Sequence, residues 1–160
     1  MGHWLKTDGL TIRQMVDLPP VWLIGAILLV WGQAQVWPGG TIVLPGQSIL
    51  SAAFFWCGLA LMGWAIWSFR QARTSVIPHQ TPVRIITSGP FRFSRNPIYL
   101  GDLMVLAGVI LGQGAWPSVI LLPLLMVILQ RRFIAQEEAR MKDNFGQEFA
   151  AYAQKTRRWL

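Results

Sequence analysis

The sequence predicts an all-α membrane protein with about four transmembrane helices and a C-terminal amphipathic cytoplasmic helix. Hydrophobic residues make up 53% of the 160-residue chain and charged residues only 13%, which is too apolar for a typical soluble domain. Uncharged apolar runs recur along the chain, and its Lys and Arg residues lie outside them. The length indicates a single domain, residues 1–160. We interpret the net charge of +7 as headgroup anchors and topology signals, and we expect no nucleic-acid partner.

The first part of the domain, residues 1–69, is predicted to hold an interfacial segment and two spans. Residues 1–18 mix apolar with charged side chains, so we expect them to lie at the lipid headgroups. The first span follows over 21–37, just long enough to cross a bilayer. The second span runs over 49–69, and the loop 38–46 between the two carries no charge.

The second part, residues 70–160, begins with a long polar connection over 70–96 that is rich in arginine and proline. A third apolar run follows over 97–111, and a fourth over 118–129. Both are short for independent spans. We therefore expect a tight helical hairpin, turning at 112–117, whose second helix continues beyond the membrane.

Residues after Arg131-Arg132 have the pattern of an amphipathic helix. At about 100° per residue one stripe is apolar, and it contains Ile134, Met141, Phe145 and Tyr152. Glu137 and Glu138 fall on either side of the centre of this stripe, so they point partly toward whatever it covers. Gly146 is expected to break the helix.

The distribution of charge predicts the orientation of the chain. The loops 38–46 and 112–117 contain no Lys or Arg, whereas the N-terminal segment, the 70–96 connection and the residues after Gln130 contain all fourteen. By the positive-inside rule both termini and the long connection face the cytoplasm. The candidate functional residues then share the cytoplasmic face.

The junction between the polar connection and the third span holds the strongest local signal. Pro97 suits a first helical position because its φ is fixed and it lacks an amide hydrogen. Asn96 is a good N-cap residue type, so a helix is predicted to begin at Asn96-Pro97. Arg92 and Arg95 lie just upstream, and a helix N-terminus favours anions, so the junction is suited to a carboxylate or phosphate. The alternative is that the arginines only anchor the chain at the membrane interface.

Three acidic residues lie where burial would be costly. Glu137 and Glu138 must pair if they face a packed stripe, either as structural braces with Arg92, Arg95 or Arg131 or as ligand-binding groups. Asp102 lies about one and a half turns into the third span. An ionisable residue at membrane depth indicates function by default, but Asp102 pairing with Arg95 near the interface is an equal alternative.

The junction and the final helix together carry a resemblance to a known superfamily. The motif is Arg95-Asn96-Pro97-Ile98-Tyr99-Leu100-Gly101, preceded by Thr87-Ser88-Gly89-Pro90-Phe91-Arg92-Phe93 and followed by Glu137-Glu138 and Phe145-Gly146-Gln147-Glu148-Phe149. Over about its last eighty residues, the chain resembles the isoprenylcysteine carboxyl methyltransferase and phospholipid methyltransferase superfamily, integral membrane enzymes that use S-adenosylmethionine. The resemblance implies that residues 70–160 form the cofactor-binding half and that the active site faces the cytoplasm.

The resemblance also implies which residues form the site. With it we assign cofactor binding to Asn96, Pro97, Tyr99, Leu100, Gly101, Glu137 and Glu138, and catalysis to Arg95 and Asn96. Asp102 joins the catalytic candidates because it is ionisable at membrane depth. The carboxyl methyltransferases usually have histidine where this chain has Asn96, whereas the phosphatidylethanolamine N-methyltransferases have Asn-Pro. The methyl acceptor therefore stays open among a prenylcysteine carboxylate, a phospholipid amine and a small lipophilic thiol or amine.

Two other function classes remain as alternatives. Sterol reductases, which use NADPH, resemble the same superfamily in their C-terminal halves but have much longer chains. A small non-enzymatic transporter subunit would explain the spans but not the charged motifs gathered at one end. No metal site is expected, because His3 and His79 are isolated in polar segments and Cys57 is the single cysteine. The sequence does not specify the oligomeric state.

Overall fold

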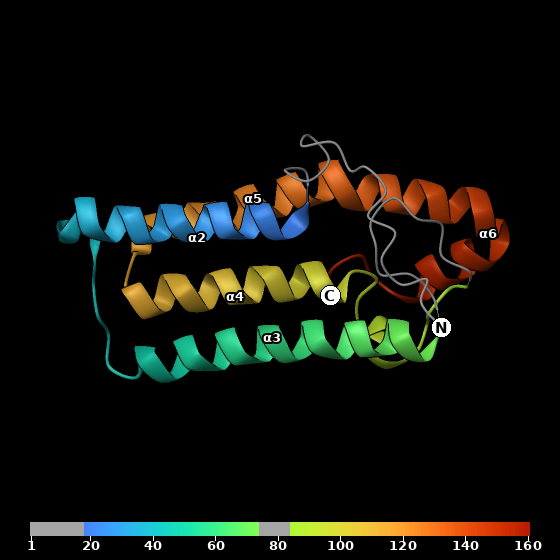
Figure 1. Ribbon diagram of the computed structural model, residues 1–160, viewed down its shortest axis with the longest axis horizontal. Helices are drawn as coiled ribbons and strands as arrows, with labels where there is room; N and C mark the ends of the chain where they lie inside the picture. Colours follow the sequence, from blue (N-terminus) through green and yellow to red (C-terminus); the bar gives the residue numbers. More distant parts are fainter. Residues whose placement is uncertain (1–17, 74–83) are drawn as a thin grey trace, which may run out of the picture.

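The structure, a computed structural model, describes residues 18–73 and 84–160. The described helices are α2 (Pro19–Val36), α3 (Gln47–Gln71), α4 (Pro97–Gln113), α5 (Leu121–Leu129) and α6 (Ala135–Lys155). Helices α2 to α5 run side by side as an antiparallel bundle, and α6 continues past one end of it before the chain turns back (Figure 1). The all-α membrane fold predicted from the sequence is confirmed.

Three helical stretches are long and apolar enough to cross a membrane: α2, α3 and the run from Trp116 to Lys155, part of which is α5. The fourth apolar helix, α4, has 17 residues. Each predicted span matches a helix, with ends displaced by a few residues. The predicted interfacial segment 1–18 lies outside the described residues except for Leu18.

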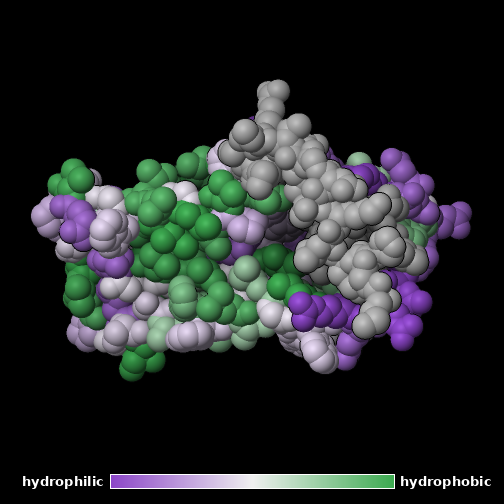
Figure 2. Space-filling view, viewed as in Figure 1, coloured by the Kyte–Doolittle hydropathy of each residue, from purple (hydrophilic) through white to green (hydrophobic). Residues whose placement is uncertain are grey.

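The outer surface of the bundle is apolar. Figure 2 shows hydrophobic side chains gathered over the helices and hydrophilic ones toward both ends. On α2 and α3 the large exposed side chains include Leu28, Leu29, Trp31, Trp56 and Trp67. Soluble proteins rarely expose apolar surface on this scale, so these side chains face lipid and the protein is an integral membrane protein.

Helices α3 and α4 make the most extensive helix contact in the described part of the chain. Glycines on α4 allow it. A Cβ on Gly108 would lie 2.7 Å from the Phe55 backbone nitrogen, and a Cβ on Gly58 of α3 would lie 2.8 Å from the Gly101 carbonyl oxygen. Ser51 also donates a hydrogen bond to the Gly108 carbonyl at 2.8 Å. Small residues therefore let the two backbones touch, as in other membrane helix pairs.

The two charge-free loops meet at the end of the bundle opposite α6. Thr41 and Ala115 form an isolated antiparallel bridge, and the Trp116 indole donates to the Ile42 carbonyl at 2.8 Å. The Gln47 side chain donates to the Leu111 carbonyl across the same end. These contacts tie the α2–α3 loop to the turn of the α4–α5 hairpin.

The α5–α6 run is one helical rod with two irregular points. A 3₁₀ turn, Trp116–Ile120, precedes α5, and a π-helical turn, Gln130–Ile134, joins α5 to α6. The predicted extension of the second hairpin helix beyond the apolar zone is thus observed. At Gly146 the backbone has φ of 47° and ψ of −114°, so the expected break in the amphipathic helix is confirmed.

Candidate functional site

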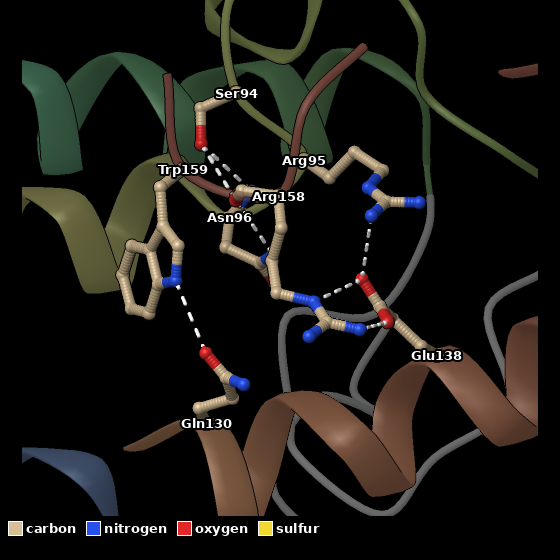
Figure 3. A network of polar contacts seen from close by, with 7 residues as sticks. All are labelled: Ser94, Arg95, Asn96, Gln130, Glu138, Arg158 and Trp159. Carbon is tan, nitrogen blue, oxygen red and sulfur yellow. Dashed lines mark hydrogen bonds and ion pairs between the residues drawn. The ribbon is translucent and has the colours of Figure 1, made fainter. Parts of the chain in front are cut away.

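The predicted site residues lie where the start of α4, the π-helical turn and the first turn of α6 come together. Residues 156–160 cross this same place after α6 has turned back (Figure 3). All four bundle helices have one terminus at this end (Figure 1). The site is therefore built from segments far apart in sequence.

The junction before α4 is rigidly hydrogen-bonded. A 3₁₀ turn, Gly89–Arg92, opens on Gly89, whose φ of 61° favours glycine. Ser94, which is buried, accepts a hydrogen bond from the Asn96 amide at 3.1 Å and donates to the Arg158 carbonyl at 3.2 Å. These bonds fix the chain just before Pro97.

Asn96 occupies the N-cap position of α4, but its side chain makes no capping hydrogen bond. The expectation from its residue type was wrong in this respect. Its side-chain nitrogen, Nδ2, instead donates a hydrogen bond to the Arg158 carbonyl at 3.0 Å. The backbone of Asn96, with φ of −130° and ψ of 58°, directs the side chain toward residues 156–160.

Glu138 is held by two arginines. Arg158 donates from Nε to Oε1 at 3.0 Å and from its terminal nitrogen to Oε2, which makes a two-pronged ion pair. Arg95 approaches Oε1 from the other side at 3.2 Å (Figure 3). The expected brace with Arg95 is present, and its second partner is Arg158, not Arg92 or Arg131. The hydrogen bond to Glu138 raises the pKa of Arg158.

Glu137 has a different environment. Its Oε1 accepts a hydrogen bond from the Tyr99 hydroxyl at 2.8 Å, and among the described residues it forms no ion pair. Burial raises the pKa of Glu137, and the Tyr99 hydrogen bond offsets part of that rise. The glutamate pair thus splits into one member braced by two arginines and one half-buried member for which the described residues supply no salt bridge.

Asp102 is only 1% exposed, and its Oδ2 has no hydrogen-bond partner in the part of the chain that the structure describes. The described residues include no ion pair between Asp102 and Arg95, so that alternative is not observed. At the same end, two buried donor atoms, Arg95 Nε and Trp22 Nε1, also lack a hydrogen-bond partner among the described residues. The Arg132 guanidinium lies 5.1 Å from the Trp22 ring centroid, which places Trp22 of α2 beside the π-helical turn. Buried orphaned polar atoms are rare in folded proteins, so this end has unmet hydrogen-bonding capacity.

The remaining predicted residues, Pro97, Leu100 and Gly101, lie in the first turns of α4, and not all of them face the candidate site. Pro97 is buried at the start of α4 and Leu100 is half-buried. Gly101 packs on α3, where an added Cβ would collide with Met62 and the Gly58 carbonyl. Its contribution to binding stays a prediction, and its visible role is helix packing.

Several residues of the site were missed by sequence reasoning. Arg158 and Trp159 lie past the end of α6, and the Trp159 indole donates to Gln130 Oε1 at 3.3 Å. The Tyr152 hydroxyl donates to the Phe91 carbonyl at 2.8 Å, which fastens the second half of α6 to the junction. The sequence placed Tyr152 on the apolar stripe of the final helix but did not predict its contact with Phe91. No local pattern marks Arg158 and Trp159, because their contacts depend on the chain turning back at Gly146.

A cleft of about 410 Å³ lies beside this cluster, between the 87–92 segment and the second half of α6. Its lining includes Arg92, Glu148 and Lys155 and none of the predicted site residues. We place the candidate site at the orphaned buried atoms and not in this cleft, because the cleft is open and its charged side chains are exposed.

Comparison with known proteins places the chain among membrane methyltransferases. Residues 47–148, more than half of the chain, match the family described as phospholipid methyltransferase. An uncharacterized protein of Haemophilus influenzae is 39% identical over 66 residues, which cover 39% of this chain and the whole of that protein. No solved structure matches the chain significantly. The match includes α3, α4, the glutamate pair and Gly146, and on this basis the chain belongs to the phospholipid methyltransferase family.

Proposed function

We propose that the protein transfers a methyl group from S-adenosylmethionine to a lipophilic acceptor in the membrane. One observation carries the proposal. The start of α4 and the glutamate pair, distant in sequence, are joined by the Tyr99–Glu137 hydrogen bond at 2.8 Å and the Arg95–Glu138 ion pair at 3.2 Å. Family membership supports methyltransferase activity in general. Family membership does not specify the cofactor or the site residues, so both are part of this proposal.

The orphaned groups fit this cofactor. S-adenosylmethionine offers hydroxyl and amino donors and one carboxylate acceptor. Asp102 Oδ2 is a buried acceptor without a donor, and Arg95 Nε and Trp22 Nε1 are buried donors without acceptors. Since buried polar groups are costly when unpaired, the cofactor carboxylate beside the two donors, and a proton of the bound methyl acceptor beside Asp102, would stabilise this end of the bundle.

The proposed roles follow from these environments. Glu137 and Glu138 accept hydrogen bonds from the ribose hydroxyls or the amino group. Arg95 and the positive N-terminus of α4 hold the carboxylate. Asn96, Pro97, Tyr99, Leu100 and Gly101 form the wall on the α4 side. When bound, the cofactor supplies a methyl group made electrophilic by its sulfonium.

Catalysis in this proposal consists mostly of positioning. The protein must align the acceptor with the methyl group, exclude water and stabilise the change in charge. Asp102 can take a proton from the acceptor at Oδ2, the atom that has no partner. Arg95 and Asn96 orient the acceptor beside it. The apolar surface of the bundle lets the acceptor enter from lipid.

The cofactor assignment is tested with the detergent-purified protein by thermal stabilisation. S-adenosylhomocysteine is expected to raise the melting temperature, since a ligand at one hundred times its dissociation constant adds about 2.7 kcal/mol of stability. NADPH is the matched comparison. Stabilisation by NADPH alone would favour the reductase alternative, and no response to either ligand would favour a non-enzymatic role.

The acceptor class is tested by methyl transfer in vesicles. Labelled S-adenosylmethionine is supplied with a prenylcysteine, a phospholipid amine or a small lipophilic thiol or amine in turn. We expect label in the lipid phase with one class. Label remaining wholly on the cofactor with every class would oppose the proposal.

We also propose that both termini and the site face the cytoplasm, where the cofactor is made. The charge-free loops at the opposite end of the bundle support this orientation. Cysteines introduced at Thr41 and Gln113 in a Cys57→Ser background should react with an impermeant reagent in intact cells. A cysteine at Ser88 should react only after lysis, and its reaction in intact cells would reverse the orientation.

A further inference from the structure

Arg158 joins the two halves of the site through both its backbone and its side chain. Its carbonyl accepts hydrogen bonds from Ser94 Oγ at 3.2 Å and from Asn96 Nδ2 at 3.0 Å. Its guanidinium forms the two-pronged ion pair with Glu138. One residue therefore connects the junction before α4 to the first turn of α6 (Figure 3).

The neighbouring arginine makes a contrast. Arg157 is exposed, and within 18–73 and 84–160 its guanidinium donates only to the Leu160 carbonyl, at the long distance of 3.5 Å. Its backbone carbonyl accepts from the Arg95 amide at 3.0 Å, a contact that does not depend on its side chain. Two adjacent arginines thus occupy the same segment, and only Arg158 directs its charge into the site.

We propose that Arg158 is a positioning residue, which fixes the Glu138 carboxylate for the bound cofactor. The inference rests on the proposed function and adds a residue to it. Arg95 alone makes a single contact with Glu138 at 3.2 Å, which leaves the carboxylate free to rotate. The planar fork of Arg158 engages both oxygens and sets the carboxylate plane.

A lysine at this position would keep the charge but not the fork. Arg158→Lys should therefore keep part of the cofactor affinity that Arg158→Gln loses. The side chains of Arg158 and Glu138 are 35% and 18% exposed. The ion pair is thus partly solvated and contributes modestly to stability, so its loss should affect cofactor affinity more than folding.

The test measures S-adenosylhomocysteine affinity by calorimetry and the melting temperature of the ligand-free protein. Arg158→Gln should weaken binding about tenfold, within the range for hydrogen bonds to a charged group, and Arg158→Lys should weaken it less. Arg157→Gln, the matched control, should change affinity less than about twofold. The double variant Glu138→Gln/Arg158→Gln should bind no more weakly than Glu138→Gln alone, because Arg158 acts through Glu138.

Different failures have different meanings. Equal affinities for the Arg157 and Arg158 variants, while the wild type binds normally, would overturn the positioning role and leave the proposed function intact. A lower melting temperature with unchanged affinity would assign Arg158 a purely structural role. If Arg158→Gln weakens binding as much in the Glu138→Gln background as in wild type, Arg158 does not act through Glu138. Absence of binding to the wild type would remove the proposed function, and this inference with it.

Discussion

The Tyr99 hydroxyl donates a hydrogen bond to the Glu137 carboxylate across 2.8 Å, joining the first turn of α4 to the first turn of α6. Tyr99 is 6% exposed, and its ring stacks on Phe133 of the π-helical turn with centroids 6.4 Å apart. The ring and the hydroxyl of Tyr99 thus fasten α4 to adjacent turns of the α5–α6 run. Because Glu137 has no salt bridge among the described residues, the tyrosine is its principal partner.

Replacing Tyr99 by phenylalanine tests this contact. The ring stacking should survive, whereas the half-buried Glu137 carboxylate loses its donor. We expect the free energy of unfolding to fall by about 1–3 kcal/mol, the range for losing a hydrogen bond to a charged group. The measurement is reversible denaturation in detergent. In the Glu137→Gln background the same change should cost less, since a neutral acceptor forms a weaker bond. Equal losses in both backgrounds would show that the hydroxyl acts elsewhere.

The raised pKa of Glu137 predicts a pH dependence of stability. Above its ordinary value of 4.5, the unfolded state gives up the proton while the folded state keeps it. The folded state then binds more protons, so stability falls as the pH rises from 4.5 through the raised pKa. Glu137→Gln removes this loss. The melting temperature of the variant relative to wild type should therefore increase with pH across that window and then level off.

The quantity to follow is the difference in melting temperature between Glu137→Gln and wild type. Other groups titrate in both proteins, so their contributions largely cancel in this difference. A difference that stays constant from pH 4.5 to 8 would contradict the burial of an ionisable carboxyl at this place. One that decreases with pH would mean that Glu137 is stabilised as an anion by a cation. The sign of the slope thus reports the environment directly.

Asn96 gives a prediction that reverses the expectation from its residue type. A capping role would make Asn96→Asp nearly neutral, because Asn and Asp cap equally well. The side chain is instead a donor to the Arg158 carbonyl. A carboxylate cannot donate, and it would face that oxygen in a buried place. We expect Asn96→Ala to cost about 1 kcal/mol and Asn96→Asp to cost more, as measured by melting temperature. An aspartate variant as stable as wild type would restore the capping role.

The spans and the helix break were predictable because each depends on local chemistry. Apolar length sets a span, Pro97 suits a helix start, and Gly146 permits a positive φ that other residues resist. The pairing of the 38–46 loop with the 112–117 turn was not predicted, since backbone contacts between loops leave no compositional trace.

Several residues that the structure brings together at this end were named from the sequence, but the contacts between them were not predicted. The resemblance named Glu137 and Glu138 together, whereas their different partners emerge only from the folded chain. Arg158 was missed because its role requires α6 to turn back and lie along the junction. Such a contact joins residues 62 positions apart, beyond any periodicity of a single helix.

The close contact of α3 and α4 gives the last prediction. A Cβ on Gly108 would lie 2.7 Å from the Phe55 amide nitrogen and 2.9 Å from the Ser51 carbonyl oxygen, both backbone atoms that cannot rotate away. Gly108→Ala should push the helices apart and lengthen the Ser51 hydrogen bond, costing about 1–3 kcal/mol as overpacking does. Gly63→Ala on α3 is the matched control, since a methyl group added there would have nothing within 4 Å and alanine favours a helix. Melting temperatures should therefore fall for Gly108→Ala and hold or rise for Gly63→Ala. Equal behaviour of the two variants would show that the helices have room to spare at Gly108.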